Sequence, residues 1–295
     1  MPNRQEHQLE VRTFLQDHFS HNDWEFSLPH GWGKESYFAH GNGQGYFVKV
    51  GVEAERYLAM SETGLTPPVI HHGQLDSGVT IIVQSFIEGR EPSRKDYREQ
   101  MNDVAEIIRK LHNNPRIKEV VKVTPSDHYK DAGLLALDCL RLKWERYKAQ
   151  VPSVVGFVEE SLEQIEKRIN QFTREGLVAS HGDICNANWI FASDGKIYLI
   201  DFDMMKLDDP AADLGALLWW YYPPDLRESF LEMAGYCYDD AFKFRMQVRM
   251  AMHCLDIRLP RKNSFDQFKP ESFRESLRDF RAVFDRKDNP EGYDL

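Results

Sequence analysis

The sequence predicts an α+β protein with a small β-sheet lobe that carries one helix, followed by a larger, mainly helical lobe. Two short runs of β-branched and aromatic residues, 46–50 and 79–84, lie between glycine-containing turns, a pattern typical of hairpin strands. After Gly89, apolar residues recur every three to four positions, which indicates amphipathic helices. We therefore expect an N-terminal lobe over residues 1–89 and a C-terminal lobe over residues 90–295.

The individual elements follow from the same patterns. The helix of the first lobe is expected over residues 53–61, where Gly64 and Pro67 would end it. The second lobe is expected to contain helices over 97–112, 134–150 and 155–174, and short strands over 177–180, 189–191 and 197–200. The last residues, 285–295, are polar and are expected to be frayed.

Composition excludes several classes of protein. The 37 basic and 47 acidic residues give a net charge of −10, which argues against a nucleic-acid partner, since a phosphate-binding surface needs basic residues. The four cysteines form no C-x-x-C pair and are too few for a disulfide framework, which favours a reducing cytoplasm. The start of the chain does not resemble a signal peptide, and apolar runs such as 214–222 are too short to cross a bilayer. We expect a cytoplasmic protein without a membrane partner; the sequence does not indicate its oligomeric state.

Three polar residues carry the chemical signal. Asp183 precedes Asn188 by five positions, the spacing of the catalytic aspartate and metal-binding asparagine in kinases, and Asp201 follows an apolar run. In phosphoryl transfer, one carboxylate orients the substrate hydroxyl, while an amide and a second carboxylate hold Mg²⁺ on the nucleotide phosphates. Taken singly, each residue is equally compatible with an ordinary turn or strand end. Their combination favours phosphoryl transfer.

His181, Gly182 and Asp183, taken with Asn188 and Asp201, resemble the aminoglycoside phosphotransferase and choline kinase superfamily. These small-molecule kinases carry His-Gly-Asp where protein kinases have His-Arg-Asp. The resemblance implies a two-lobed protein-kinase-like fold, ATP and Mg²⁺ as cofactors, and a small-molecule hydroxyl as the phosphate acceptor. It also implies Asp183 as the catalytic carboxylate, Asn188 and Asp201 as the metal ligands, and His181 as a residue that orients the loop.

The same resemblance implies a strand lysine that reaches the nucleotide phosphates, and Lys49 lies in a suitable apolar strand. Without the downstream motif, a solvated lysine on an edge strand would be the preferred explanation of Lys49. Its acidic partner is expected on the following helix, where Glu53 and Glu55 are both available, and we favour Glu53. Further on, Asp213 resembles the aspartate that braces the catalytic loop in the superfamily.

Two further segments are assigned to the nucleotide. Gly31 and Gly33 lie where a phosphate-covering loop belongs, and glycines there would let backbone N–H groups approach phosphate oxygens. The backbone near Ser85 and Ile87 resembles the segment that joins the lobes and bonds adenine in the superfamily.

The function predicted from these residues is transfer of the γ-phosphoryl group of ATP to a hydroxyl of a small molecule. The alternatives are a pseudokinase that binds nucleotide as a regulator, and a protein kinase. The intact set of Asp183, Asn188 and Asp201 argues against the first, and the lack of an activation loop argues against the second. The sequence does not select among the superfamily's acceptors, such as choline, ethanolamine and aminoglycosides.

The aromatic run 219–222 has two explanations. Clustered Trp and Tyr residues can hold a cationic amine, but four consecutive helical residues point in four directions, and packing in the core is favoured. Asp203, Asp208 and Asp209 lie close in sequence to the predicted metal site, and many acceptors of the superfamily are cations. We therefore expect an amine-bearing alcohol or amino sugar.

Overall fold

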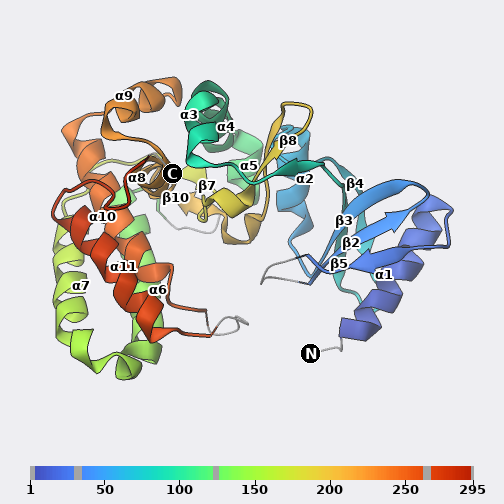
Figure 1. The fold of residues 1–295 in the computed structure, drawn as a ribbon, viewed down its shortest axis with the longest axis horizontal. Coiled ribbons are helices and arrows are strands. Elements are labelled where there is room, and N and C mark those ends of the chain that lie inside the picture. The colour runs from blue at the N-terminus through green and yellow to red at the C-terminus, as the bar shows by residue number, and fades with distance from the viewer. Residues whose placement is uncertain (1–3, 30–34, 122–125, 262–266, 294–295) are drawn as a thin grey trace. The chain divides into compact units, whose positions relative to one another are not determined.

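The computed structural model describes residues 4–29, 35–121, 126–261 and 267–293 (Figure 1). It consists of two compact units: unit 1 contains Met1–Glu91 and Trp189–Asp203, and unit 2 contains Pro92–Asn188 and Met204–Leu295. The chain thus returns to unit 1 for one short segment in the middle of unit 2. The sequence places that segment in the C-terminal lobe. A nucleotide-binding role for the N-terminal lobe (1–89) and a catalytic and substrate-binding role for the C-terminal lobe (90–295) stay predictions.

Unit 1 is built on an antiparallel sheet with the strand order β1-β2-β3-β5-β4 (Figure 1). Its strands are β1 (Glu25–Ser27), β2 (Ser36–Gly41), β3 (Gln44–Val50), β4 (Val69–Gln74) and β5 (Thr80–Ser85). The predicted strands 46–50 and 79–84 are confirmed as β3 and β5. Asn42 and Gly43 join β2 to β3 with φ values of +54° and +72°, as a two-residue hairpin turn requires.

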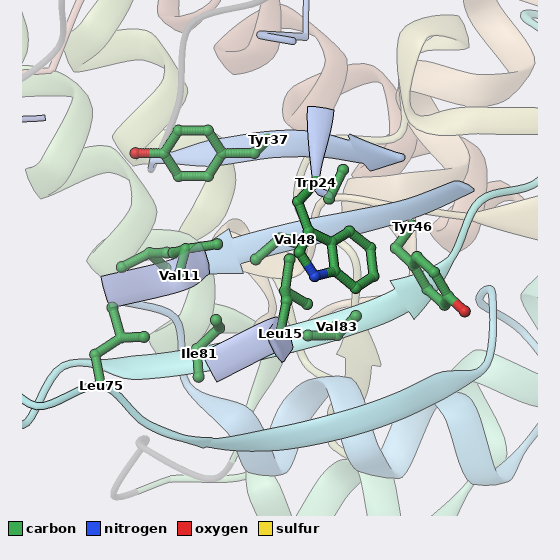
Figure 2. Packing of buried hydrophobic residues seen from close by; sticks show 11 residues of the cluster. Val11, Leu15, Trp24, Tyr37, Tyr46, Val48, Leu75, Ile81 and Val83 are labelled. Atoms are coloured by element: carbon green, nitrogen blue, oxygen red, sulfur yellow. The ribbon is translucent and has the colours of Figure 1, made fainter. Parts of the chain in front are cut away.

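One face of this sheet is covered by α1 (Arg4–Phe19), whose Val11 and Leu15 are fully buried against Val48 of β3 and Val83 of β5 (Figure 2). The prediction of a single helix in this lobe is therefore wrong. The apolar stripe of α1 is narrow and lies among charged and amide residues, so that it does not stand out in the sequence. The four-residue spacing of the two buried side chains was the available signal.

The predicted helix over 53–61 is confirmed as α2 (Ala54–Glu62). Alternate residues of a strand face opposite sides of a sheet. Because Val48 faces the cluster under α1, its neighbour Lys49 faces the opposite side, where its amine contacts Tyr57 of α2. The segment that returns to unit 1 pairs β8 (Trp189–Ala192) with β9 (Ile197–Leu199) and with β6 (Gly89–Arg90).

Unit 2 is mainly helical. Its helices are α3 (Arg94–Glu99), α4 (Met101–Asn113), α5 (Pro115–Val120), α6 (Tyr129–Tyr147), α7 (Val155–Ile169), α8 (Ala211–Tyr221), α9 (Pro224–Met233), α10 (Asp240–Asp256) and α11 (Pro270–Phe284). A two-stranded antiparallel sheet pairs β7 (Val178–Ser180) with β10 (Lys206–Asp208). The predicted helix 97–112 is divided at Gln100, which leaves helical geometry with φ −111° and ψ 30°. In unit 2, α10 packs against α6, α8 and α11 (Figure 1).

The C-terminal segment 285–293 is held in place, contrary to the expectation of fraying. Arg94 of α3 donates to the carbonyl of Gly292 at 2.9 Å, and Arg227 of α9 donates to the hydroxyl of Tyr293 at 2.6 Å. The two arginines that bind this segment lie far earlier in the chain. The sequence of the segment itself therefore did not indicate that it would be held in place. Across the described ranges, no helix is both long and apolar enough to span a membrane.

Candidate functional site

The loop that contains Asp183 begins directly after β7 and requires glycine at position 182. Gly182 has a φ of +77°, and a Cβ atom there would lie 2.5 Å from the carbonyl oxygen of Met204. Both the backbone conformation and the close approach exclude a side chain. The glycine of the His-Gly-Asp motif therefore has a structural explanation: it lets the chain turn beneath Met204 and leaves Asp183 half-buried.

We expect Gly182→Ala to lower the free energy of unfolding by about 2 kcal/mol or more, from left-handed strain plus the clash with Met204. Gly176→Ala is the matched control, because Gly176 also has a positive φ (+100°), but a Cβ atom at this position would have no neighbouring atom within 4 Å. The free energies of unfolding of both variants in urea separate the cost of backbone strain from the cost of the clash with Met204. Equal losses in the two variants would contradict the close contact at Gly182.

Asp213, in the first turn of α8, holds this loop from beneath. Its buried carboxylate accepts hydrogen bonds from the Ser180 hydroxyl at 2.8 Å and from the backbone N–H groups of His181 at 2.8 Å and Gly182 at 3.0 Å. Burial by itself would raise the pKa of Asp213, but the bond and charge of His112, with His181 and the Gly182 N–H group, lower that pKa to about 2. The carboxylate is ionised at neutral pH and braces the loop, as expected.

His112 continues this buried network. Its Nε2 atom lies 3.1 Å from the Asp213 carboxylate, and its Nδ1 atom lies 2.8 Å from the Tyr236 hydroxyl. Because an ionised carboxylate can only accept, Nε2 is the donor in the contact with Asp213. His181, which was expected to orient the loop, is fully buried and is tied to Asp213 through its backbone. The orienting role of its side chain stays a prediction.

Asn188 closes the same loop at its far end. Its buried side-chain amide Nδ2 donates to the backbone carbonyl of Asp183 at 2.8 Å. This bond fixes the rotamer and leaves the amide oxygen as the atom that can bind a cation. No described side chain donates a hydrogen bond to the Asp183 carboxylate itself. Unit 2 therefore presents a rigid loop with a carboxylate whose oxygens are available for a ligand.

Unit 1 brings Lys49 together with Asp201. The Lys49 amine contacts the Asp201 carboxylate at 2.8 Å and the Tyr57 hydroxyl at 2.8 Å, although the two charged residues are 152 positions apart. Burial alone would lower the pKa of Lys49, but Tyr57 and Asp201 outweigh it and raise that pKa, so Lys49 is a permanent cation. Since Lys49 is buried on a central strand, the alternative of a solvated edge-strand lysine is wrong.

Asp201 has an uncommon backbone conformation, with a φ of +64°. Non-glycine residues in this region cost of order 1 kcal/mol, and they persist where surrounding contacts hold them in place. Tyr57 was not predicted as a site residue, because its sequence position indicated only an apolar contact of α2. Burial raises its pKa to about 12, so its hydroxyl stays protonated beside Lys49.

Glu53 does not pair with Lys49 in this structure. It precedes α2 as the N-cap residue, and its carboxylate contacts Arg56 at 2.8 Å with the Glu53 side chain 64% exposed. The short connection from β3 to α2 places Glu53 at the helix start rather than over the strand. Lys49 uses Asp201 as its carboxylate partner, and any contact of Glu53 with nucleotide stays a prediction.

The remaining nucleotide-binding predictions are placed as follows. Ser85 ends β5 and its backbone N–H already donates to the carbonyl of Pro68 at 3.0 Å, so this N–H is not available to adenine. Ile87 lies in the segment between β5 and β6 and is half-buried. Gly31 and Gly33 lie outside the described residues.

One protein family matches the part of the chain that contains these residues. Residues 27–245 match the family described as the phosphotransferase enzyme family. The chain belongs to this family. The matched range includes Lys49, the Asp183–Asn188 loop, Asp201 and Asp213, and it confirms the superfamily that the motif indicated.

Solved structures of this superfamily share the fold along nearly the whole chain. Choline kinase LicA from Streptococcus pneumoniae is 15% identical, with a TM-score of 0.57 and coverage of 94% of this chain and 99% of its own. A choline/ethanolamine kinase family protein from Mesorhizobium loti is 17% identical, with a TM-score of 0.64 and coverage of 96% of each chain. The GDP and kanamycin complex of the phosphotransferase APH(2")-IIia is 14% identical, with a TM-score of 0.62 and coverage of 94% and 99%. The chain therefore has the two-lobed α+β fold of the kinase-like phosphotransferases.

Asn188 and Asp201 were predicted as magnesium ligands, and each side chain has an oxygen of the kind that binds this ion. Mg²⁺ in phosphoryl-transfer sites is held by one or two protein oxygens and by the phosphates themselves. The Asp201 side chain is 41% exposed, and the amide oxygen of Asn188 is not engaged by the Asp183 contact; the roles of both residues as metal ligands stay predictions. Within the described residues, no three His, Cys, Asp or Glu side chains form a metal-binding group on their own.

Asp208 and Asp209 are not available to a cationic acceptor, contrary to the expectation. Both are buried, and each pairs with an arginine of α10: Arg249 with Asp208, and Arg245 with Asp209 at 2.9 Å. These ion pairs were not predicted, because the arginines lie about 40 residues later, beyond the range of local patterns. The two aspartates anchor α10 to the segment after β10.

The aromatic run at the end of α8 is divided between the core and the loop. Trp219 and Tyr222 are buried, which confirms the core-packing explanation for these two residues. Tyr221 is half-buried, and its hydroxyl accepts a hydrogen bond from the backbone N–H of Asn186 at 2.9 Å. Tyr221 therefore supports the Asp183–Asn188 loop from the side, a role that the sequence did not indicate.

Proposed function

We propose that this phosphotransferase moves the γ-phosphoryl group of ATP to a hydroxyl of a small molecule. The observation that carries the proposal is the loop of unit 2: Asp183 stands half-buried on a turn that Asp213 fixes from beneath and Asn188 closes. A fixed carboxylate whose oxygens are not occupied by the protein can accept the hydrogen of an acceptor hydroxyl and orient its oxygen for in-line attack.

Lys49, Asp201 and Asn188 have the nucleotide roles in this proposal. Lys49 supplies a permanent positive charge for the phosphates, and Asp201 fixes its position through the 2.8 Å contact. Asp201 and Asn188 would hold Mg²⁺, which when bound supplies positive charge to the phosphate oxygens. Fold relatives support nucleotide binding, since their structures include complexes with AMP, GDP and AMP-PNP.

For the acceptor we propose an alcohol that carries an amine, such as an amino alcohol or amino sugar. Fold relatives named as choline or choline/ethanolamine kinases, and others solved with kanamycin or hygromycin B, support this class. Because Asp208 and Asp209 are paired with arginines, we assign the attraction of such a cation to Asp183, whose carboxylate no described side chain bonds. The second candidate, a pseudokinase that regulates without turnover, is disfavoured by the intact Asp183, Asn188 and Asp201.

An acceptor panel tests this proposal. Ethanolamine, choline and kanamycin serve as cationic acceptors, ribose and glycerol as neutral ones, and glycerate as an anionic one. We expect ATP-dependent phosphorylation of at least one compound, with one ADP formed for each phosphorylated product and the highest kcat/KM for a cation. A neutral or anionic compound as the best acceptor would contradict the proposal of an amine-bearing acceptor. Failure to phosphorylate any compound of the panel would contradict the transferase activity.

We expect Lys49→Ala to lower kcat/KM for ATP about a hundredfold, because the variant loses the phosphate contact and leaves Asp201 without its cation. Lys196→Ala is the control, since the Lys196 side chain is 68% exposed and its ion pair among the described residues is with Asp194 in the same turn. Steady-state kinetics with varied ATP measure the effect. An unchanged kcat/KM for ATP in Lys49→Ala would remove the lysine from nucleotide positioning.

A further inference from the structure

Helix α10 carries three basic side chains in one stripe. Arg245, Arg249 and His253 are spaced four residues apart, which places them on the same face of the helix. The first two are buried and pair with Asp209 and Asp208. His253, the third member of the stripe, is half-buried and has no hydrogen-bond partner among the residues that the structure describes. Two of the three basic groups of this stripe thus contribute to folding.

The charged groups that act most strongly on His253 include Asp256, Asp183, Lys143 and Asp213. Asp256 and Lys143 already form an ion pair at 2.7 Å, and Asp213 is occupied by His112 and by the loop that it braces. The catalytic loop's Asp183 is the remaining group, and no described side chain bonds its carboxylate. An imidazole and a carboxylate, both with available polar atoms, therefore lie in the same part of unit 2.

We propose that His253 recognises the phosphate acceptor, by a hydrogen bond from its imidazole to a polar group adjacent to the hydroxyl that Asp183 orients. This inference rests on the proposed function. A half-buried polar group without a protein partner is satisfied by water or by a ligand. Since the ring lies within electrostatic range of a carboxylate that needs a bound hydroxyl for its role, the acceptor is the ligand that would fit there.

The chemistry of the ring limits the acceptor class. Burial lowers the pKa of His253 despite the nearby Asp256 and Asp183, so the ring is neutral at pH 7 and offers one N–H donor and one lone-pair acceptor. Such a ring bonds a second hydroxyl or a primary amine, as in ethanolamine, ribose or kanamycin. It cannot form a hydrogen bond with the quaternary ammonium of choline. His253 would therefore discriminate between acceptors that differ only in this second group.

The test compares substitutions at His253 on the full-length chain. His253→Phe keeps an aromatic ring without nitrogen, His253→Asn places an amide near the position of Nδ1, and His253→Gln places one near Nε2. His128→Phe is the matched control, since the His128 side chain in the same unit is 58% exposed. The measurements are KM for the best acceptor of the panel, KM for choline, KM for ATP, and ATP hydrolysis without acceptor.

We expect His253→Phe to raise KM for the best hydrogen-bonding acceptor about tenfold, the size of one lost hydrogen bond. The KM values for ATP and choline and the rate of ATP hydrolysis should stay within about twofold of wild type, since a general loss of folding would change all of them together. Either the Asn or the Gln variant should restore most of the acceptor affinity.

Two results would overturn the inference while the proposed function stands: an unchanged acceptor KM in His253→Phe, or a parallel loss of ATP affinity and hydrolysis in all three variants. Highest activity with choline alone would also overturn it, because choline lacks a group for the ring to bond. A wild-type enzyme that phosphorylates no compound of the panel overturns the proposed function instead, and the acceptor role of His253 with it.

Discussion

Replacing Asp183 with asparagine is expected to lower kcat by about a hundredfold to ten-thousandfold, the range for loss of a positioned general base. The fold should be retained, because the loop is held by the Asp183 backbone carbonyl and by Asp213, and the described structure uses no Asp183 side-chain bond. Affinity for ATP should change little, since Asp183 acts on the acceptor hydroxyl.

Kinetics and ATP binding on the same preparations of Asp183→Asn measure both effects. The control is Asp194→Asn, at an exposed turn where Asp194 bonds only its neighbour Lys196. A variant that retains a tenth of the wild-type kcat would remove Asp183 from its assigned role. A large loss of ATP affinity with unchanged kcat would instead indicate that Asp183 acts in nucleotide binding.

Replacing Asp201 with asparagine is expected to weaken binding of ATP in the presence of Mg²⁺ by about tenfold or more, because the metal loses a charged ligand. The same change removes the carboxylate partner of buried Lys49, which should cost about 1 kcal/mol of stability. The loss is smaller than for a fully buried pair, because the Asp201 side chain is 41% exposed.

Titration calorimetry with ATP in Mg²⁺ and in EDTA separates the two effects of Asp201→Asn. The metal role predicts that wild type and variant differ strongly in Mg²⁺ and by less than about threefold in EDTA, where both rely on Lys49. Equal deficits in the two buffers would show that Asp201 acts through Lys49 alone. Equal affinity of both proteins in Mg²⁺ would contradict the assignment as a metal ligand.

Local patterns predicted the elements near the site well. The strand around Lys49 and the turn after β7 follow from short apolar runs and from the residue types of the loop. Such signals lie within a few residues, where periodicity and turn chemistry act. The requirement for glycine at position 182 is also partly local, since the φ of +77° belongs to the turn itself.

The contacts that complete the site could not be predicted in this way, because they join distant parts of the chain. Lys49 meets Asp201 at a separation of 152 positions, and His112 meets Asp213 at a separation of 101. Sequence reasoning placed Glu53 beside Lys49 because it considered only the next helix. Which carboxylate pairs with Lys49 depends on the three-dimensional fold, and local patterns in a single sequence do not show it.

The amphipathic pattern also failed to predict helix α1, because the buried apolar stripe of this helix is narrow. Helix α1 buries Val11 and Leu15 through one face, while most of its other residues are charged or polar and Leu9 is 68% exposed. A short, polar-looking helix can still be required for folding when it covers a sheet. Here it covers the face of the sheet opposite to Lys49.

The most direct test of the central claim follows the labelled phosphoryl group. Wild type and Asp183→Asn are incubated with γ-labelled ATP, Mg²⁺ and the acceptor panel, and label is then measured separately in small molecules and in protein. The proposed function predicts label in a phosphorylated small molecule with wild type, in amounts equal to the ADP formed, and nearly none with Asp183→Asn. Label found only in protein, or equal transfer by both proteins, would contradict it.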